Sequence, residues 1–349
     1  MKEKIKKMLA NDRGAIDLQR FADPGTHEYE LNVNTTGSQG LQNENKTYYH
    51  DTLIDNAEPY LVHDQFAEEI NIPEHGGKTV EVRIFDVLDK KTTALQEGVT
   101  PDGNSLSMSV KNATVYQYGD YVAISDVVSV TAIDPILVQA TKAMGSQAGR
   151  SLDTITRDIL TAGTNVLYAP KIANGVVTPI TSRANIDSDC KLTVDIILKA
   201  AAQLEANLAE PINGSYVAII HPYAAYDLMR CPEFIEWHKY ASPQELYRGE
   251  IGMIGNVRFV KSTEAKIIKV TGNDNPIFMT MVLGKGAYAT TYANGLGLEH
   301  IVKPLGAGDD PLNQRATVGW KATKTALRLK EQNMVRIESS SSFTTVNPN

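Results

Sequence analysis

A single stretch, residues 134–162, carries the longest continuous helical pattern in the chain, and it limits the possible folds more than any other feature. Its apolar side chains recur every three or four residues and so share one face of an α-helix; they are Ile136, Ala140, Met144, Ala148, Leu152, Ile155 and Ile159. Asp134 suits the N-cap, Pro135 suits the first helical position, and Gly163 ends the pattern. About 28 residues at ~1.5 Å each predict a rod of ~42 Å, which is longer than most helices of globular proteins.

Several residues inside this stretch add detail to the expected helix. Gly145 and Gly149 lower its local helix propensity, so we expect another segment to pack closely there. Asp153 and Arg157 are spaced for an i,i+4 ion pair. The two glycines also match a nucleophile elbow, but Ser146 is in the wrong position, and a helix interior cannot supply the strained turn that this motif needs.

Ahead of the helix, two strand patterns are separated by a long polar connection. Residues 80–84 alternate apolar and charged side chains, and a second β-rich run covers roughly residues 107–131. The connection between them, residues 89–106, is longer than most loops inside compact domains, and such loops are usually functional. Two strands alone are at best marginally stable in water, so this extended hairpin must either fold back on its own domain or lie on a neighbouring molecule, and we favour the neighbouring molecule.

The beginning of the chain is poor in apolar side chains. Residues 22–47 contain only five, which are Ala22, Tyr29, Leu31, Val33 and Leu41. This apolar surface is too small to offset the entropy lost on ordering the segment, which predicts an arm that is mobile or becomes ordered on another surface. From residue 48 to Gly76, helical spacing returns and predicts two short helices divided by Pro59.

Beyond residue 190, helix and strand patterns are mixed rather than strictly alternating, which predicts an α+β architecture. Thr193 caps a helix whose apolar positions are Ile197, Ala201, Leu204 and Leu208. The strand patterns of this region fall at residues 216–220, 257–260, 277–282 and 334–337. A short helix is expected after His221-Pro222, and a polar tail is expected from Ser339 onward.

Composition and charge argue against several classes of protein. Lys and Arg total 34 against 41 Asp and Glu, and the formal charge of −7 argues against binding nucleic acid as the main role. Two cysteines, Cys190 and Cys231, are too few for a disulfide framework and indicate a reducing compartment. No run approaches the ~18 apolar residues of a membrane span, and the basic N-terminus lacks the apolar stretch of a secretory signal. We therefore expect a soluble chain of intracellular origin.

The motifs that resemble reactive or ligand-binding sites are all incomplete. Gly76-Gly77-Lys78-Thr79 looks like the end of a phosphate-binding loop, but Ile72 stands where that loop needs glycine, and a strand follows instead of a helix. Gly295-Leu296-Gly297 begins like a dinucleotide-binding loop, but no helical pattern follows it. The seven histidines show no zinc-binding spacing. We expect no catalytic residue, no cofactor and no metal site.

A cationic cluster lies near the C-terminus, beside Trp320. It consists of Lys321, Lys324, Arg328 and Lys330. Such a cationic face could bind a polyanion. Clusters of this kind are more often simply exposed to solvent, and we expect a solvated face here.

A series of segments occurs in an order and at a spacing that is typical of one protein family. They are Ala57–Ala67, Gly76–Glu81, Glu97–Gly103, Tyr116–Val122, Leu152–Ile155, Ala162–Val166, Gly249–Gly252, Val257–Val260 and Val318–Lys321. In these segments the chain resembles the major capsid proteins of tailed phages, specifically the N-four type, on the fold named for phage Hong Kong ninety-seven. The resemblance runs from about residue 48 to residue 340, and the arm before it carries little of it.

The resemblance implies a role for each region. Residues 78–125 would form an extended loop over the adjacent subunit, and its contacting tip would consist of Glu97, Gly98, Val99, Thr100, Pro101, Asp102 and Gly103. The spine helix, 134–162, would pack through Ile136, Met144, Leu152, Ile155 and Ile159. The remaining regions would be an N-terminal arm (1–47), an N-terminal helical segment (48–77), a peripheral domain with the spine helix and the last strand (126–169 and 317–349) and an axial domain (170–316).

The implied function is structural: the chain would assemble, as hexamers and pentamers, into the icosahedral head shell of a tailed double-stranded DNA phage. Implied partners are further copies of the chain, then portal, scaffolding and decoration proteins, with packaged DNA contacted non-specifically and no membrane. Synthesis would take place in the host bacterial cytoplasm. A shell works through surface complementarity repeated by symmetry, which needs no reactive group. Two alternatives stay open: an encapsulin-like nanocompartment shell, and a nucleotide-binding enzyme built on the motif around Lys78.

Overall fold

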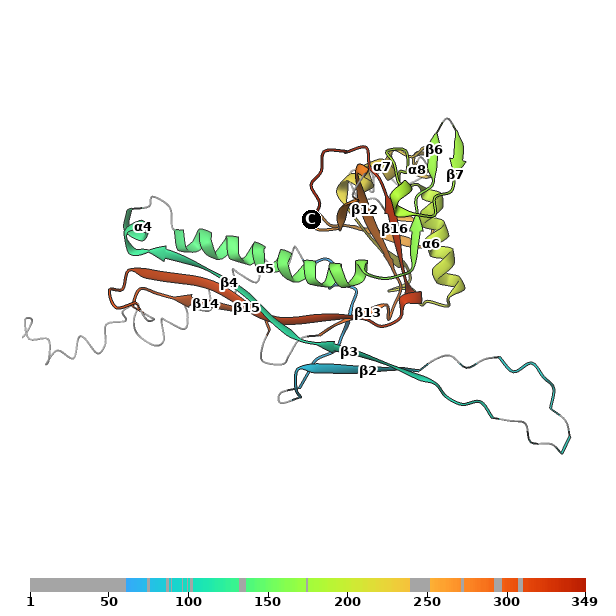
Figure 1. Ribbon diagram of the computed structural model, residues 1–349, viewed down its shortest axis with the longest axis horizontal. Helices are drawn as coiled ribbons and strands as arrows, with labels where there is room; N and C mark the ends of the chain where they lie inside the picture. The colour runs from blue at the N-terminus through green and yellow to red at the C-terminus, as the bar shows by residue number, and fades with distance from the viewer. Residues whose placement is uncertain are drawn as a thin grey trace, which may run out of the picture. The chain divides into compact units, whose positions relative to one another are not determined.

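The computed structural model describes residues 61–349 apart from 74–75, 86–87, 89, 96, 99, 101–102, 132–135, 174, 239–251, 271–272, 292–296 and 307–309. In this part of the chain, helices and strands are mixed, which confirms the expected α+β class (Figure 1). The expected arm at residues 1–47, the first part of the helical segment (48–60), and the capping residues Asp134 and Pro135 lie outside the described residues. The second short helix expected after Pro59 is wrong, because residues 62–66 form turns and Glu68–Glu69 form the short strand β1.

Helix α5, Ile136–Thr161, is the long helix that the apolar spacing predicts, and its 26 residues at ~1.5 Å each span ~39 Å. It lies along strands β4, Tyr116–Ser125, and β15, Arg315–Arg328 (Figure 1). The buried members of the apolar cluster between them are Ile124, Met144, Ala148, Leu152, Val318, Trp320 and Ala322. Gly145 and Gly149 are buried as well, in agreement with the close packing expected at both glycines.

Strand β15 organises a five-stranded sheet. Its N-terminal part pairs antiparallel with β4 on one side and with β14, Glu299–Lys303, on the other. Its C-terminal part pairs with β13, Tyr288–Thr291, beside which β1, Glu68–Glu69, adds a short parallel strand. One 14-residue strand therefore connects all parts of this sheet.

A second, seven-stranded sheet contains the larger apolar core. Its order is β5, β16, β12, β8, β10 and β9, with β11 paired to β12. In chain order, the bounds are β5 Val166–Tyr168, β8 Tyr216–Ile220, β9 Met253–Ile254, β10 Val257–Lys261, β11 Ile267–Val270, β12 Asn273–Leu283 and β16 Met334–Ser339. The helices of this region are α6 Val194–Ala206, α7 Pro222–Met229 and α8 Pro232–His238, with short 3-10 turns at Arg183–Asn185 and Glu331–Asn333. Every residue of β8 is buried. Tyr216, Ala218 and Ile220 share a core with residues of these helices, and Ile219, on the other face, packs in a separate cluster with Leu160 of α5.

The last strand, β16, expected in one domain with the long helix, pairs with β12 and β5 in the seven-stranded sheet, and it meets only the end of α5, where Arg336 donates to the Thr161 carbonyl. It is β15 that packs on α5. All residues of β16 are buried, and a central place in a covered sheet supplies cover for both of its faces. The polar tail expected from Ser339 is also wrong at its start, since Ser339 and Ser341 are buried. Asp227 accepts hydrogen bonds from the Ser341 hydroxyl at 2.6 Å and from the Ser342 amide at 2.9 Å.

Two further expectations fail where elements end. The strand expected to continue to residue 131 stops at Ser125, which caps the short helix α4, Asp126–Thr131, by accepting a hydrogen bond from the Val128 amide at 3.3 Å. Leu208, expected on the apolar face of α6, follows the end of that helix. It has a φ of 58° and is 87% exposed.

Leu152 provides a direct test of the packing of α5, because it is 3% exposed. We expect Leu152→Asp to prevent soluble folding, since it would bury an unpaired carboxylate. Leu152→Ala should lower the free energy of unfolding by ~2–5 kcal/mol. Thermal melting followed by circular dichroism measures both effects, and Gln139→Asp on the exposed side of the same helix is the control. A normal melting curve for Leu152→Asp would show that this face is not a core.

His221, the N-cap of α7, should make stability depend on pH. Its Nδ1 accepts a hydrogen bond from the Tyr223 amide at 3.2 Å, and burial lowers its pKa to about 4. In the unfolded chain the pKa is ~6.5, so as the pH falls the unfolded chain binds the proton first. The free energy of unfolding should therefore fall by ~2 kcal/mol between roughly pH 6.5 and pH 5 through this residue. Urea titrations of the parent chain and of His221→Asn measure it, and parallel pH curves for the two would contradict the assignment.

Candidate assembly surface

The β2–β3 hairpin exposes a large apolar surface. β2, Thr79–Phe85, pairs antiparallel with β3, Met108–Thr114, in continuous register. Among the described strands, these two pair only with each other (Figure 1). The exposed apolar side chains of the hairpin and its loop are Phe85, Leu88, Leu95, Leu106, Met108 and Val110, each 44–75% exposed. An isolated hairpin with this much apolar surface in water favours a covering partner.

The loop between these strands is exposed at each of its described residues. Of the predicted contact residues, Glu97, Gly98, Thr100 and Gly103 are described and exposed. The other three, Val99, Pro101 and Asp102, lie outside the described residues. Gly98 has a φ of 78°, a left-handed conformation that glycine adopts without strain. The structure confirms the long connection between two strands, and the role of its tip stays a prediction.

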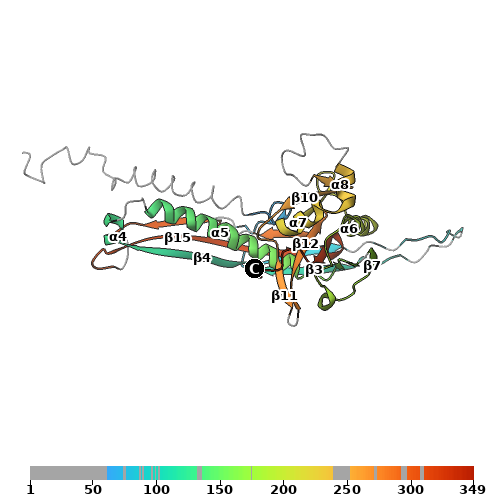
Figure 2. The ribbon, with the colours of Figure 1, turned by 90° about the horizontal axis from the view of Figure 1, so that it is seen from above.

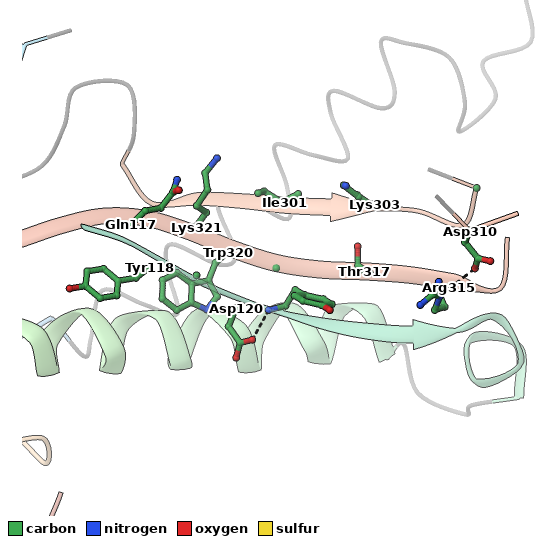
Figure 3. A pocket seen from close by; sticks show the side chains of 14 residues that line it. Gln117, Tyr118, Asp120, Ile301, Lys303, Asp310, Arg315, Thr317, Trp320 and Lys321 are labelled. Carbon is green, nitrogen blue, oxygen red and sulfur yellow. Dashed lines mark hydrogen bonds and ion pairs between the residues drawn. The ribbon is translucent and has the colours of Figure 1, made fainter. Parts of the chain in front are cut away.

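A groove of about 750 Å³ lies on the sheet of β4, β14 and β15 (Figure 3). Its lining combines aromatic and charged side chains, among them Tyr118, Tyr121, Lys303, Arg315, Trp320 and Lys321. Trp320 points toward α5, whereas Lys321 points away from that helix (Figure 3). Asp120 accepts hydrogen bonds from the Gln147 side chain at 2.6 Å and from the Tyr121 amide at 2.8 Å, and these bonds lower its pKa. With Tyr121 69% exposed, the groove offers a second surface that another chain can cover.

A buried ion pair fixes β15 to α5 and to the segment before β1. Lys324 is fully buried, pairs with Asp64, and donates a second hydrogen bond to the Leu152 carbonyl at 2.9 Å. The Thr156 hydroxyl donates to the other oxygen of Asp64 at 2.6 Å. Burial lowers the pKa of the Lys324 ammonium, and the negative charge of Asp64 opposes this shift. Three segments far apart in the sequence are joined at this point.

The expectation of a solvated cationic face is therefore wrong at Lys324. β15 is buried on both sides around this residue, so alternation along the strand does not bring it to solvent. Its neighbours in the cluster are paired at the surface: Lys321 with Glu299 at 3.0 Å and Arg328 with Glu331 at 3.2 Å. The cluster is part of the packing of β15 rather than one continuous basic patch.

A second buried contact holds the same segment on α5. Asp153 accepts hydrogen bonds from the amide and from the Nδ1 of His63, both at 2.7 Å. The Tyr288 hydroxyl donates to the carbonyl of His63. The expected ion pair between Asp153 and Arg157 is wrong, because Asp153 faces the core, and Arg157 donates to the Glu264 carbonyl at 2.8 Å.

The glycine-rich motif at residues 76–79 leads directly into a strand. Thr79 is the first residue of β2, and Gly77 has a φ of 85°. A phosphate-binding loop opens a helix whose N-terminal amides hold the phosphate, so this turn lacks that geometry. The described residues contain no group of three or more metal-binding side chains. Among the described helices, none has the length and apolar character to cross a membrane.

Comparison with known proteins decides the family. Residues 109–337, well over half of the chain, match the family described as phage capsid protein. The chain belongs to the phage capsid protein family. It is a major capsid protein, a structural component of the phage virion. A search among curated proteins gives no match.

Solved phage capsids share the fold of this capsid protein. The capsid of cyanophage P-SCSP1u matches with a TM-score of 0.60 at 16% identity, and the match covers 79% of this chain and 87% of the cyanophage chain. The capsid of Ralstonia phage GP4 has a TM-score of 0.60 at 14% identity, with 81% and 87% covered. The cyanophage Pam1 capsid has a TM-score of 0.61 at 13% identity, with 82% and 92% covered. The expected capsid fold is confirmed.

The residues predicted to pack the spine helix of this capsid protein lie at different depths. Met144 and Leu152 are buried in the cluster with β4 and β15. Ile136 and Ile155 are partly buried against the same cluster, and Ile159 is half-buried.

Sequence reasoning missed the apolar residues that flank the loop. Phe85 and Leu88 precede its polar tip, and Leu106 and Met108 follow it. These apolar residues stand on both sides of a polar segment, and this placement could have indicated an apolar surface at both ends of the loop. The pair of Asp64 and Lys324 gave no such signal, because 260 positions separate its members.

The buried pair can be tested by removing one or both charges. Asp64→Ala leaves the Lys324 ammonium buried without its carboxylate, which should lower the free energy of unfolding by ~3–5 kcal/mol. The double variant Asp64→Ala/Lys324→Met removes both charges and should recover much of that loss. Urea denaturation of the parent chain, of Asp64→Ala, of Lys324→Met and of the double variant measures the four free energies. If the effects of Asp64→Ala and Lys324→Met simply add in the double variant, the two residues are not coupled and the account of this pair fails.

Proposed function

We propose that this capsid protein builds its shell by laying the β2–β3 hairpin and its loop over an adjacent subunit. The observation that carries the proposal is the exposed apolar surface of the hairpin, from Phe85 at one end of the loop to Met108 at the other. Among the described strands, these two pair only with each other, so they cannot bury both of their faces, and a second chain would supply the cover. The tip, Glu97 to Gly103, would make the contact furthest from its own subunit.

The regional roles extend this proposal. Residues 1–47 would be an arm, and 78–125 would be the extended loop. A peripheral domain would hold the spine helix, and an axial domain, residues 170–316, would meet other copies at the fivefold and sixfold centres of the shell. The two large sheets support a division into these two domains, because the five-stranded sheet packs on α5 and the seven-stranded sheet has an apolar core of its own. The last strand, β16, belongs with the second sheet in this division.

The partners follow from the same role. Further copies of the chain, as hexamers and pentamers, would be the main partner, and portal, scaffolding and decoration proteins would join the head. The formal charge of −7 suits a container for DNA, because a strongly cationic wall would hold the packaged polymer and hinder its movement. The protein would be made in the cytoplasm of the host bacterium before it enters the virion.

Shortening the loop tests the proposal. Deleting residues 92–104 and joining the ends with a short Gly-Ser linker should leave a folded subunit that no longer forms shells, because the covering element is lost. Electron microscopy scores assembly and circular dichroism scores folding. The control replaces the same residues with a Gly/Ser segment of equal length, which keeps the reach of the loop but removes its side chains, and it should also impair assembly. Unchanged shells from the shortened chain would refute the proposal, and a small cage filled with cargo protein would favour a nanocompartment instead.

A further inference from the structure

The buried contact between Lys324 and Asp64 holds together two groups that can react with each other. The ammonium of Lys324 is hydrogen-bonded to one oxygen of the Asp64 carboxylate, so its nitrogen lies next to the carboxyl carbon. The side chain of Lys324 is fully buried, and that of Asp64 is 11% exposed. Water and dissolved molecules have little access to this nitrogen, so a group of the chain itself is the one that it can attack.

This pair differs from the other ion pairs that lysine makes within the described residues. In those pairs the lysine side chain is 23–63% exposed, so water competes for the ammonium; they are Lys171–Asp187, Lys199–Asp195, Lys266–Asp158, Lys285–Glu210 and Lys321–Glu299. The buried pair on β16 uses Arg336, whose guanidinium does not give up its proton in proteins. The contact of Lys324 with Asp64 therefore combines a primary amine with the exclusion of water.

The surroundings of the pair can promote its condensation. Burial lowers the pKa of the Lys324 ammonium against the opposing charges of Asp64 and Asp153, so the neutral amine forms more readily than in water. The Thr156 hydroxyl donates to the other oxygen of Asp64 at 2.6 Å, where it can stabilise the negative charge of a tetrahedral intermediate. The Leu152 carbonyl accepts a second hydrogen bond from the nitrogen at 2.9 Å and orients it. Two groups held in reacting positions behave as if present at ~10⁵–10⁸ M.

We infer that Lys324 and Asp64 condense to an amide, which joins β15 covalently to the segment before β1. The nitrogen attacks the Asp64 carboxyl carbon, a C–N bond forms, and one C–O bond of the carboxylate breaks. The released oxygen leaves as water with two protons of the ammonium, and the remaining proton stays on the amide nitrogen. The step needs no further reactant, and the buried ion pair is its folded precursor.

The amide lies where three parts of the chain meet, which are β15, α5 and the segment before β1. Figure 2 shows β15 and α5 side by side along much of their length. Because 260 positions separate Asp64 from Lys324, the bond closes most of the chain into one covalent loop. Such a loop restricts the unfolded chain, so the cross-linked subunit should resist denaturant better than the ion-paired one.

Mass spectrometry of the full chain tests this bond. The purified protein is incubated for days while folded, then denatured and measured. Its intact mass should fall below the sequence mass by one water molecule, and peptide mapping should find the peptide of Asp64 joined to that of Lys324. Lys324→Arg keeps the positive charge but lacks the amine, so it should form no cross-linked peptide. Lys321→Arg, a matched change at a partly exposed lysine of the same strand, should form it like the parent chain.

Two further measurements separate the amide from other losses of water. A succinimide at Asp64 would also remove one water molecule, but it would leave no cross-linked peptide and would occur in Lys324→Arg as well. The parent chain incubated in urea, where the two residues are apart, should not form the cross-link, and this control does not depend on the folding of a variant. A cross-linked peptide that requires both the folded chain and Lys324 would support the inference. A folded parent chain without that peptide, or the same peptide formed in urea, would overturn it.

Discussion

A ribbon of two strands cannot cover its own faces, and this constraint shapes the rest of the molecule. The β2–β3 hairpin carries apolar side chains along its length and on both flanks of a polar loop. In a monomeric enzyme such a segment would be a liability, since uncovered apolar surface and free strand edges promote association. In a shell the same association is the function, and the chain needs no reactive group to perform it.

The ribbon is useful only if its base is rigid, and the packing of α5 on β15 provides that rigidity. Lys324 lies at the centre of this packing, where its ammonium links Asp64 to the backbone of α5. The contact between His63 and Asp153 is a second buried contact, and it joins the segment before β1 to α5. A buried ion pair stabilises little by itself, but one that joins three distant segments fixes their geometry, because any other arrangement would leave a charge without its partner.

Local patterns were enough to predict the elements that depend on local physics. The apolar stripe of α5, the alternation along β2 and the apolar run of β8 all follow from the periodicity of side chains, and each lies where that periodicity predicts. The failures occurred where partners are remote in the sequence. Nothing near Lys324 indicates that Asp64 will neutralise it, and the short β16 does not reveal which sheet will accept it. The prediction for Leu208 failed for a local reason, because α6 ends at Ala206, two residues before the last position of its apolar pattern.

The central claim is that neighbouring subunits cover the β2–β3 hairpin, and hydrogen exchange measures this most directly. Backbone amides of residues 79–85 and 108–114 would be compared in dissociated subunits and in assembled shells, with the β8 amides as an internal reference that stays protected in both. The account predicts rapid exchange along the hairpin in free subunits and strong protection in shells. Equal exchange of the hairpin amides in the two states would contradict it.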